Sequence, residues 1–174
     1  MIEYRCKYFQ RYIIMNKTKL RIKKLDERAT VPSYGSEFSA GADIYALCDE
    51  PMTIEAGKTA FVHTGISLEI PEGLVGLIYA RSGLACKSGL APANKVGVID
   101  SDYRGEIVVA LHNHGDVART VSMGDRIAQM AFAPYVYADF EEAEASAPQE
   151  NKRSIKREGN DKPHLCKGRW HGLP

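Results

Sequence analysis

Two polar segments combine residue types that suit phosphate and acid–base chemistry. Residues 80–85 (ARSGLA) place a cation, a hydroxyl group and a glycine at an expected helix start. This arrangement suits an anion, because free N–H groups point outward and glycine lets the backbone come close. The same segment is compatible with a surface arginine followed by a capped helical turn, so alone it does not identify a phosphate site.

Residues 98–107 (VIDSDYRGEI) bring two carboxylates, a phenol and an arginine to an expected hairpin between apolar strands. A carboxylate beside a bound water can act as a general base, and carboxylates can also hold a divalent cation. Because Asp-Ser-Asp is common in turns, this segment taken alone favours a simple turn.

Two further segments carry weaker signals. Residues 124–130 (GDRIAQM) include Gln129, which we expect to face inward from an apolar strand. A buried amide needs a partner, either a ligand or a neighbouring backbone group. Residues 40–46 (AGADIYA) include Asp43, whose carboxylate is also explained by hydrogen bonds to backbone amides.

Several other chemistries are not supported by the sequence. It contains no Walker A loop, no GxGxxG and no HExxH. Residues 164–171 (HLCKGRWH) hold three potential metal ligands but lack a fourth at a recognised spacing, so we expect no zinc site there. The four cysteines stand singly and favour a reduced, cytoplasmic protein: Cys6, Cys48, Cys86 and Cys166.

Length and composition fit one globular domain. The chain has 174 residues, of which 44% are hydrophobic and 26% are charged. Lys plus Arg total 23 against 22 Asp plus Glu, which gives no electrostatic argument for nucleic acid or an anionic membrane as partner. No stretch approaches the roughly 20 apolar residues that span a bilayer, and we do not expect the N-terminal residues to act as a signal peptide.

The elements that must position these segments are β-strands. Residues 62–70 alternate between apolar and polar types, which predicts one half-buried strand. Residues 74–79 predict a strand buried on both faces, and further strands are expected at 19–23, 106–112 and 126–132. The pattern is typical of an all-β barrel, sandwich or jelly roll, with at most one short helix, for which Ser82 is the expected N-cap.

The two ends differ from this β region. We expect a β domain over residues 15–140, with residues 1–14 as an upstream extension and Met15 as the natural start. Residues 141–174 contain few large apolar side chains and predict a mobile C-terminal tail.

In this order, the four polar segments resemble the first four motifs of the trimeric dUTPase family, the deoxyuridine 5′-triphosphate nucleotidohydrolases. The resemblance covers roughly residues 17–137, and four ordered motifs are far more specific than any one of them. It implies a jelly-roll subunit and a homotrimer with active sites at subunit interfaces. It also implies Mg²⁺-dependent cleavage of dUTP to dUMP and pyrophosphate.

The resemblance implies that the second polar segment binds the nucleoside and holds the attacking water. Asp100 would be the general base that deprotonates the water attacking the α-phosphorus. Tyr103 would pack under the deoxyribose and exclude a ribose 2′-hydroxyl. Asn94 would help read the uracil edge at the start of the same hairpin, and Val98 belongs to the same substrate-binding set.

The remaining segments would hold the phosphates. Arg81, Ser82 and Gly83 would bind the phosphate chain from a different subunit than the base pocket. Gln129 would hydrogen-bond phosphate or the attacking water. Asp43 would act indirectly, either through the Mg²⁺-water network or by orienting Arg81, while the metal itself would be held mainly by the phosphates.

The chain departs from the family in its last segment. The usual fifth motif, an arginine and a glycine-rich run around one phenylalanine, is missing, and no Phe follows Phe140. Arg169 and Trp170 offer a cation and a ring, but not the glycines. An altered or frameshifted end is the favoured explanation over a divergent or a lost arm. We therefore predict retained dUTP binding with reduced turnover.

Three other functions remain open at this point. A dCTP deaminase, or a bifunctional relative of the same fold, would use a Glu base instead of Asp100 and would release ammonia. A catalytically impaired nucleotide-binding trimer would bind dUTP without releasing pyrophosphate. A purely structural trimer would bind no nucleotide.

Overall fold

The computed structural model describes residues 18–143. The predicted extension at 1–14, the start at Met15 and the tail from residue 144 onward lie outside the described residues. The chain divides into a compact unit that ends at Tyr137 and a second unit, Ala138–Pro174, of which the described residues 138–143 form no helix or strand. The site residues all belong to the first unit.

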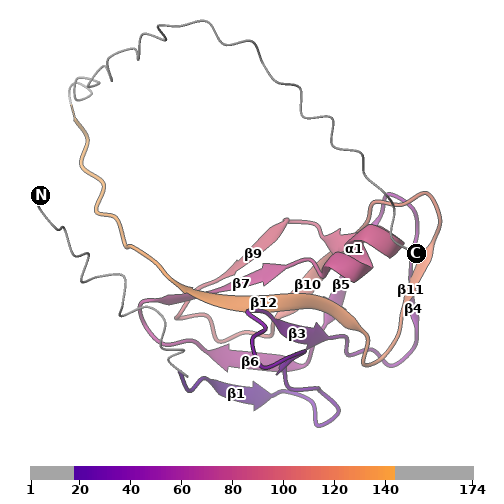
Figure 1. Ribbon diagram of the computed structural model, residues 1–174, viewed down its shortest axis with the longest axis horizontal. Coiled ribbons are helices and arrows are strands. Elements are labelled where there is room, and N and C mark those ends of the chain that lie inside the picture. The colour runs from indigo at the N-terminus through magenta and orange to yellow at the C-terminus, as the bar shows by residue number, and fades with distance from the viewer. Residues whose placement is uncertain (1–17, 144–174) are drawn as a thin grey trace, which may run out of the picture. The chain divides into compact units, whose positions relative to one another are not determined.

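The described residues form twelve strands and one helix. Figure 1 shows how they are arranged. The predicted all-β class with one short helix is therefore confirmed. In chain order the elements are β1 (Arg21–Lys24), β2 (Ser33–Tyr34), β3 (Ala42–Tyr45), β4 (Met52–Ile54), β5 (Thr59–His63), β6 (Ile66–Glu69), β7 (Leu74–Tyr79), α1 (Ser82–Ser88), β8 (Leu90–Pro92), β9 (Val96–Ile99), β10 (Val108–Asn113), β11 (Arg119–Val121) and β12 (Arg126–Pro134).

The strands pair antiparallel in four sheets. The largest has the order β2-β3-β12-β7-β9, with the long strand β12 between β3 and β7 (Figure 1). A three-stranded sheet has the order β5-β10-β8, and β1-β6 and β11-β4 form two-stranded sheets. Neighbours in space are mostly distant in sequence, which is how an antiparallel fold brings polar loops from separate segments together.

One apolar core joins these sheets. Its fully buried side chains include Ile44, Val62, Ile66, Leu111 and Met130, which come from five different strands. Burial of such side chains contributes about 1.5–3 kcal/mol each. Asn113 is the notable polar member, because its side-chain amide donates to the carbonyls of Ile54 and Val117 at 2.9 and 2.8 Å. That satisfied amide fixes the end of β10 without an unpaired polar atom.

Three local predictions are wrong. The expected single strand at 62–70 is two strands, because Gly65 takes a φ of 66° and turns the chain between β5 and β6. Residues 98–107 do not form a hairpin, because β9 pairs with β7 whereas β10 pairs with β5 and β8. Ser82 is the first helical residue and not the N-cap, since Arg81 occupies that position.

Strand β7 also differs from its prediction. Gly76 and Ile78 are buried on its inner face, but Val75 and Leu77 are only half-buried and Tyr79 is exposed. One face of β7 is therefore open in the single chain. Among residues 18–143, no helix is long and apolar enough to cross a membrane.

Candidate active site

The five-stranded sheet places two of the predicted site residues, Gln129 and Asp43, in one row. Gln129 on β12 lies opposite Asp43 on one side and opposite Tyr79 of β7 on the other. Its neighbour Met130 is buried in the core, so Gln129 points to the opposite, outer face. The prediction that Gln129 faces inward is therefore wrong. Its expected need for a partner is met by the backbone, since its amide donates to the Ala80 carbonyl at 2.8 Å.

Asp43 orients Arg81, which lies between the end of β7 and the start of α1. The Arg81 Nε donates to Asp43 Oδ1 at 2.7 Å, and a second guanidinium, that of Arg126, reaches Asp43 Oδ2 at 3.2 Å. Arg81 also donates to the Arg126 carbonyl at 3.1 Å. The Asp43 side chain is only 13% exposed and that of Arg81 only 23%. Two cations therefore share one carboxylate, which leaves an excess of positive charge at this end of the sheet.

Helix α1 follows directly from Arg81. Ser82 and Gly83 form its first turn, which contains no acidic residue. A Cβ added at Gly83 would meet no atom within 4 Å, so the backbone there is open to an approaching group. The cation of Arg81 and the hydroxyl group of Ser82 thus lie next to an open backbone position at Gly83.

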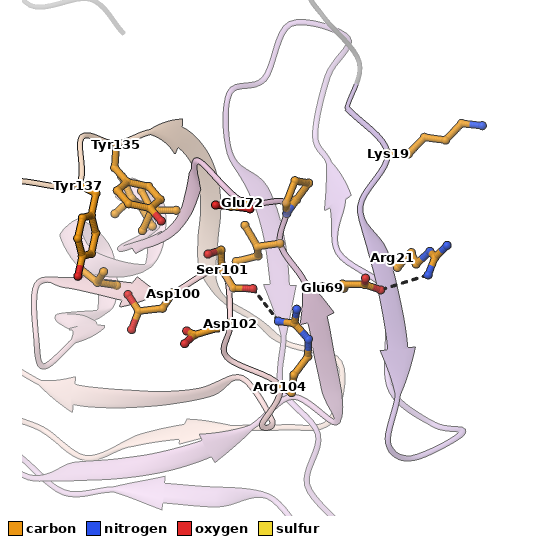
Figure 2. A pocket seen from close by; sticks show the side chains of 15 residues that line it. Lys19, Arg21, Glu69, Glu72, Asp100, Ser101, Asp102, Arg104, Tyr135 and Tyr137 are labelled. Carbon is orange, nitrogen blue, oxygen red and sulfur yellow. Dashed lines mark hydrogen bonds and ion pairs between the residues drawn. The ribbon is translucent and has the colours of Figure 1, made fainter.

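Asp100 lies at the edge of a depression with a volume of about 1290 Å³, large enough for a nucleotide. Val98, Ser101, Asp102 and Arg104 line it as well. Figure 2 shows Asp100 and Asp102 beside this depression, with Arg104 donating to the Ser101 carbonyl at 2.7 Å. The loop after β9 therefore presents exposed carboxylates on the side of the molecule where Val98 is also exposed.

Tyr103 is held by the backbone that follows it. Its hydroxyl donates to the Glu106 carbonyl at 2.9 Å, and its side chain lies over Gly105. A Cβ at Gly105 would sit 2.5 Å from the Tyr103 hydroxyl, so only glycine allows this position of the ring. The residue remains 43% exposed, which leaves an aromatic surface available to a ligand.

Asn94 lies before β9, in the turn that connects it to β8. The turn requires a φ of 63° at Lys95, and the Asn94 carbonyl accepts from the Val96 amide. Asn94 is exposed and lies near Gly97, two residues after that turn. Its side-chain amide therefore lies on the face of the sheet that Ile78 occupies, because Gly97 is opposite Ile78, and Asn94 shares no hairpin with Asp100.

The described chain does not bring its two groups of site residues together. Ile99, just before Asp100, lies opposite Gly76 of β7, whereas Arg81 follows the other end of that strand. At about 3.3 Å per residue, the two groups are separated by roughly 15–20 Å along β7. One group (Asp43, Arg81, Gln129) suits phosphates, and the other (Val98, Asp100, Tyr103) suits a nucleoside and a water.

Two charged residues near the site were missed by sequence reasoning. Arg126 is the second cation on Asp43, and Glu106 accepts from the backbone amides of Thr64 and Gly65. Partial burial raises the pKa of the Glu106 carboxyl, but hydrogen bonds from His63 and the Gly65 amide outweigh it, so the pKa lies below 4.5. A signal existed for Glu106, because a carboxylate directly before a buried strand needs a partner.

The chain's own residues do not form a metal cage. Among residues 18–143, no three His, Cys, Asp or Glu side chains lie close enough to hold a metal ion. The Asp43 carboxylate is already shared by two arginines. This donor set fits Mg²⁺ only where a ligand supplies most of the oxygens, which agrees with the reluctance of Mg²⁺ to lose its water.

Comparison with known proteins gives one consistent family. The dUTPase family model matches residues 27–157. A deoxyuridine 5′-triphosphate nucleotidohydrolase of Desulfitobacterium hafniense (strain DSM 10664 / DCB-2) is 47% identical over 129 residues, which cover 72% of this chain and 85% of that protein. An enzyme of the same name from Pasteurella multocida (strain Pm70) is 46% identical over 127 residues, which cover 70% of this chain and 84% of its own.

The fold is similar to that of solved dUTPases. A mutant dUTPase from phage phi11 of S. aureus, described with a coordinated structural Mg(II) ion, superimposes with a TM-score of 0.67 at 24% identity. The match covers 75% of this chain and all of that one. This likeness confirms the predicted jelly-roll type of β subunit.

Proposed function

The chain belongs to the dUTPase family, and from that premise we propose that it hydrolyses dUTP to dUMP and pyrophosphate by attack of water on the α-phosphorus. Relatives with this enzyme's name match it at 46–47% identity over most of their length. The observation that carries the proposed mechanism is the loop after β9. It sets the exposed Asp100 three residues before a Tyr103 ring that its own backbone fixes.

Asp100 is the general base of this proposal. Its carboxylate is exposed at the edge of the nucleotide-sized depression, where a water can lie beside it. It takes a proton as the water oxygen bonds to the α-phosphorus, and the bond to the bridging oxygen of the leaving pyrophosphate breaks. Asp100→Asn keeps the shape but removes the basic oxygen.

The nucleoside lies against Tyr103, Val98 and Asn94. The Tyr103 ring, fixed over Gly105, offers a flat surface for the deoxyribose. A 2′-hydroxyl would collide with that surface, and this steric exclusion discriminates against UTP. The exposed Val98 adds apolar surface, and the Asn94 amide has the donors and acceptor needed to read the uracil edge.

The phosphate chain lies against Arg81, Ser82 and Gly83. Arg81 is already oriented by Asp43, so its guanidinium loses little freedom when a phosphate binds. Gln129 lies in the same row and hydrogen-bonds phosphate or the attacking water. Asp43 acts as a positioning residue for Arg81, which is one of the two roles the sequence left open.

Mg²⁺ is the proposed cofactor, and the three phosphates would supply most of its oxygen ligands. When bound, it neutralises charge that develops on the phosphate oxygens. This chain's own contribution is to supply the base, the cation Arg81 and the amide of Gln129.

We propose a homotrimer in which each site takes its two halves from different subunits. The separation of roughly 15–20 Å along β7 supports this, because one subunit cannot bring Asp100 and Arg81 to one triphosphate. The half-buried outer face of β7 gives a neighbouring subunit an apolar surface to contact. We also place the protein in the cytoplasm, because its single cysteines suit a reducing compartment.

The test follows pyrophosphate release from dUTP and Mg²⁺, with parallel reactions on dCTP, dTTP and UTP. We expect release from dUTP alone and its loss in Asp100→Asn, which should still bind dUTP. Ammonia release from dCTP would instead identify a deaminase. Binding without release by the unaltered protein would identify a nucleotide-binding trimer.

A further inference from the structure

Glu106 makes three hydrogen bonds to the turn between β5 and β6. Its Oε1 accepts from the Gly65 amide at 2.8 Å and from the Thr64 amide at 3.1 Å, while Oε2 lies 2.8 Å from His63 Nδ1. The side chain is only 25% exposed. A carboxylate with this many partners is fixed in one orientation, so residue 106 is anchored to the turn.

The turn that receives Glu106 is itself rigid. Gly65 adopts a φ of 66°, and a Cβ there would lie 2.5 Å from Leu47 Cδ2 and 2.8 Å from Ala29 Cβ. Its carbonyl accepts from the Leu25 amide at 2.7 Å. The Gly65 amide therefore has one fixed direction, and it is the Glu106 carboxylate that accepts from it.

The backbone around Glu106 is docked on the same element. Ser67 donates to the Arg104 carbonyl at 2.8 Å, and the Ile107 amide donates to the Ile66 carbonyl at 2.9 Å. Ile107 is buried in the core. The end of the loop that began at Asp100 is therefore pinned to β6 on both sides of Glu106.

The carbonyl oxygen of Glu106 connects this anchored backbone to the Tyr103 ring. The Glu106 carbonyl accepts a hydrogen bond from the Tyr103 hydroxyl, so the position of the Tyr103 ring depends on where the backbone of residue 106 lies. The Glu106 side chain does not line the depression that contains Asp100. With His63 and Gly65 it lines a different one, of about 460 Å³.

We propose that Glu106 is a positioning residue for sugar selectivity. Its carboxylate is anchored by His63, Thr64 and Gly65, and it thereby fixes the position of the Tyr103 ring, which excludes a ribose. This inference rests on the role of Tyr103 in the proposed function. It assigns part of the discrimination between dUTP and UTP to a carboxylate that touches neither nucleotide.

The test compares kcat and KM for dUTP and for UTP in the full chain, by pyrophosphate release. Glu106→Ala removes the anchor, and we expect the ratio of kcat/KM for dUTP over UTP to fall by about tenfold or more, since small displacements near a reacting group have effects of that size. Glu106→Asp keeps the charge but is one methylene too short to reach Gly65, and should shift the ratio in the same direction. Glu106→Gln keeps an oxygen for both amides and should retain the wild-type ratio within about twofold.

Glu50→Ala is the matched control. Glu50 is exposed and lines the same smaller depression as Glu106, yet its side chain makes no hydrogen bond within residues 18–143. It should leave both kcat/KM values unchanged. A merely structural role for Glu106 predicts that activity on dUTP and UTP falls in proportion, with an unchanged ratio.

Two outcomes separate the inference from the function on which it rests. A Tyr103→Ala variant that keeps the wild-type ratio overturns the role of Tyr103, and the inference with it. If Tyr103→Ala lowers the ratio of kcat/KM for dUTP over UTP, but a folded Glu106→Ala or Glu106→Asp variant keeps the wild-type ratio, only the positioning role of Glu106 is overturned. Thermal melting of each variant shows whether it is folded. If Glu106→Ala is not folded, Glu106→Asp provides the test.

Discussion

Asp43 binds both arginines that lie beside the proposed phosphate-binding residues. Its two oxygens bind Arg81 and Arg126 separately, at 2.7 and 3.2 Å, and the carboxylate is largely shielded from water. Without that negative charge, the two guanidinium groups would repel each other and Arg81 would lose its fixed orientation. Sequence spacing alone could not pair Asp43 with Arg81, because 38 residues separate them, and only the resemblance to the family suggested that Asp43 orients Arg81.

Asp43→Asn should therefore weaken substrate binding with little change in shape. We expect KM for dUTP to rise by about tenfold and the free energy of unfolding to fall by about 1.5–3 kcal/mol, the range for a lost hydrogen bond to a charged group. Steady-state kinetics and urea unfolding measure the two effects. Asp49→Asn is the control, because that carboxylate pairs with Arg28 while 83% exposed, and it should change neither quantity. Equal effects of the two variants on KM would contradict the role given to Asp43.

The Glu106 carboxyl predicts a pH dependence of stability. Its folded-state pKa lies below 4.5, since hydrogen bonds from His63 and Gly65 outweigh the effect of burial. Such a group stabilises the fold fully above its unfolded pKa, and the contribution is lost as pH falls through the lower, folded-state pKa. We therefore expect the melting temperature of the wild type to exceed that of Glu106→Gln by a few degrees near pH 7.

That difference should shrink as the pH falls below about 4.5, because Gln does not titrate. Thermal melts of both proteins from pH 7 to pH 3 measure it. A difference that stays constant across this range would show that the ionised carboxylate contributes no stability.

At the scale of elements, the apolar pattern predicted strands well but not their ends. The strands expected at 74–79 and 126–132 are β7 and β12, and the one expected at 19–23 overlaps β1. Alternation reports which side chains are buried, and it continues across residues 62–70 because every second residue of this stretch is buried: Val62, Thr64, Ile66, Leu68 and Ile70. The break between β5 and β6 is decided by the close approach of Leu47 and Ala29 to Gly65, which sequence periodicity does not contain.

The same limit applies to the elements that carry the site. The polar segments were identifiable because each interrupts an apolar stretch. The pattern of residues did not show which of these segments lie together, because that depends on the pairing of β12 with β3 and with β7, which are distant in sequence. The loop at 100–107 illustrates this most clearly, since strands adjacent in the chain belong there to different sheets.

Gly65→Ala tests the break between β5 and β6, and Gly57→Ala is its control. Both glycines have positive φ, 66° and 69°, but a Cβ at Gly57 would meet nothing within 4 Å. Gly57→Ala should therefore lose only the backbone term of about 1–2 kcal/mol. Gly65→Ala adds overpacking against Leu47 and Ala29, for a total loss of about 2–5 kcal/mol. Urea unfolding measures both, and equal losses would mean that the neighbours of Gly65 yield without cost.

At the scale of the whole molecule, the sequence of the C-terminal segment predicts slow turnover. It lacks the arginine and the glycine-rich run around a phenylalanine that the resemblance to the family implies, a segment we expect to close over the phosphates. Loss of such a closing segment reduces charge stabilisation and water exclusion without changing Asp100 or Tyr103. Replacing the segment from residue 144 with one that carries an arginine and a Gly/Phe run should raise kcat at least about tenfold. Equal kcat values for the two chains would show that the natural segment already serves this purpose.

The separation of Asp100 from Arg81 makes the assembly itself testable by mixing subunits. Asp100→Asn and Arg81→Ala should each abolish pyrophosphate release alone. If every site combines Asp100 of one subunit with Arg81 of another, unfolding and refolding the two variants together creates some sites with both residues intact. In random trimers from equal amounts, about a quarter of the sites meet that condition, so about a quarter of wild-type activity should return. Each variant refolded alone is the control. If the mixture stays inactive while forming mixed trimers, each subunit must supply both residues to its own site, and the outer face of β7 would need another explanation.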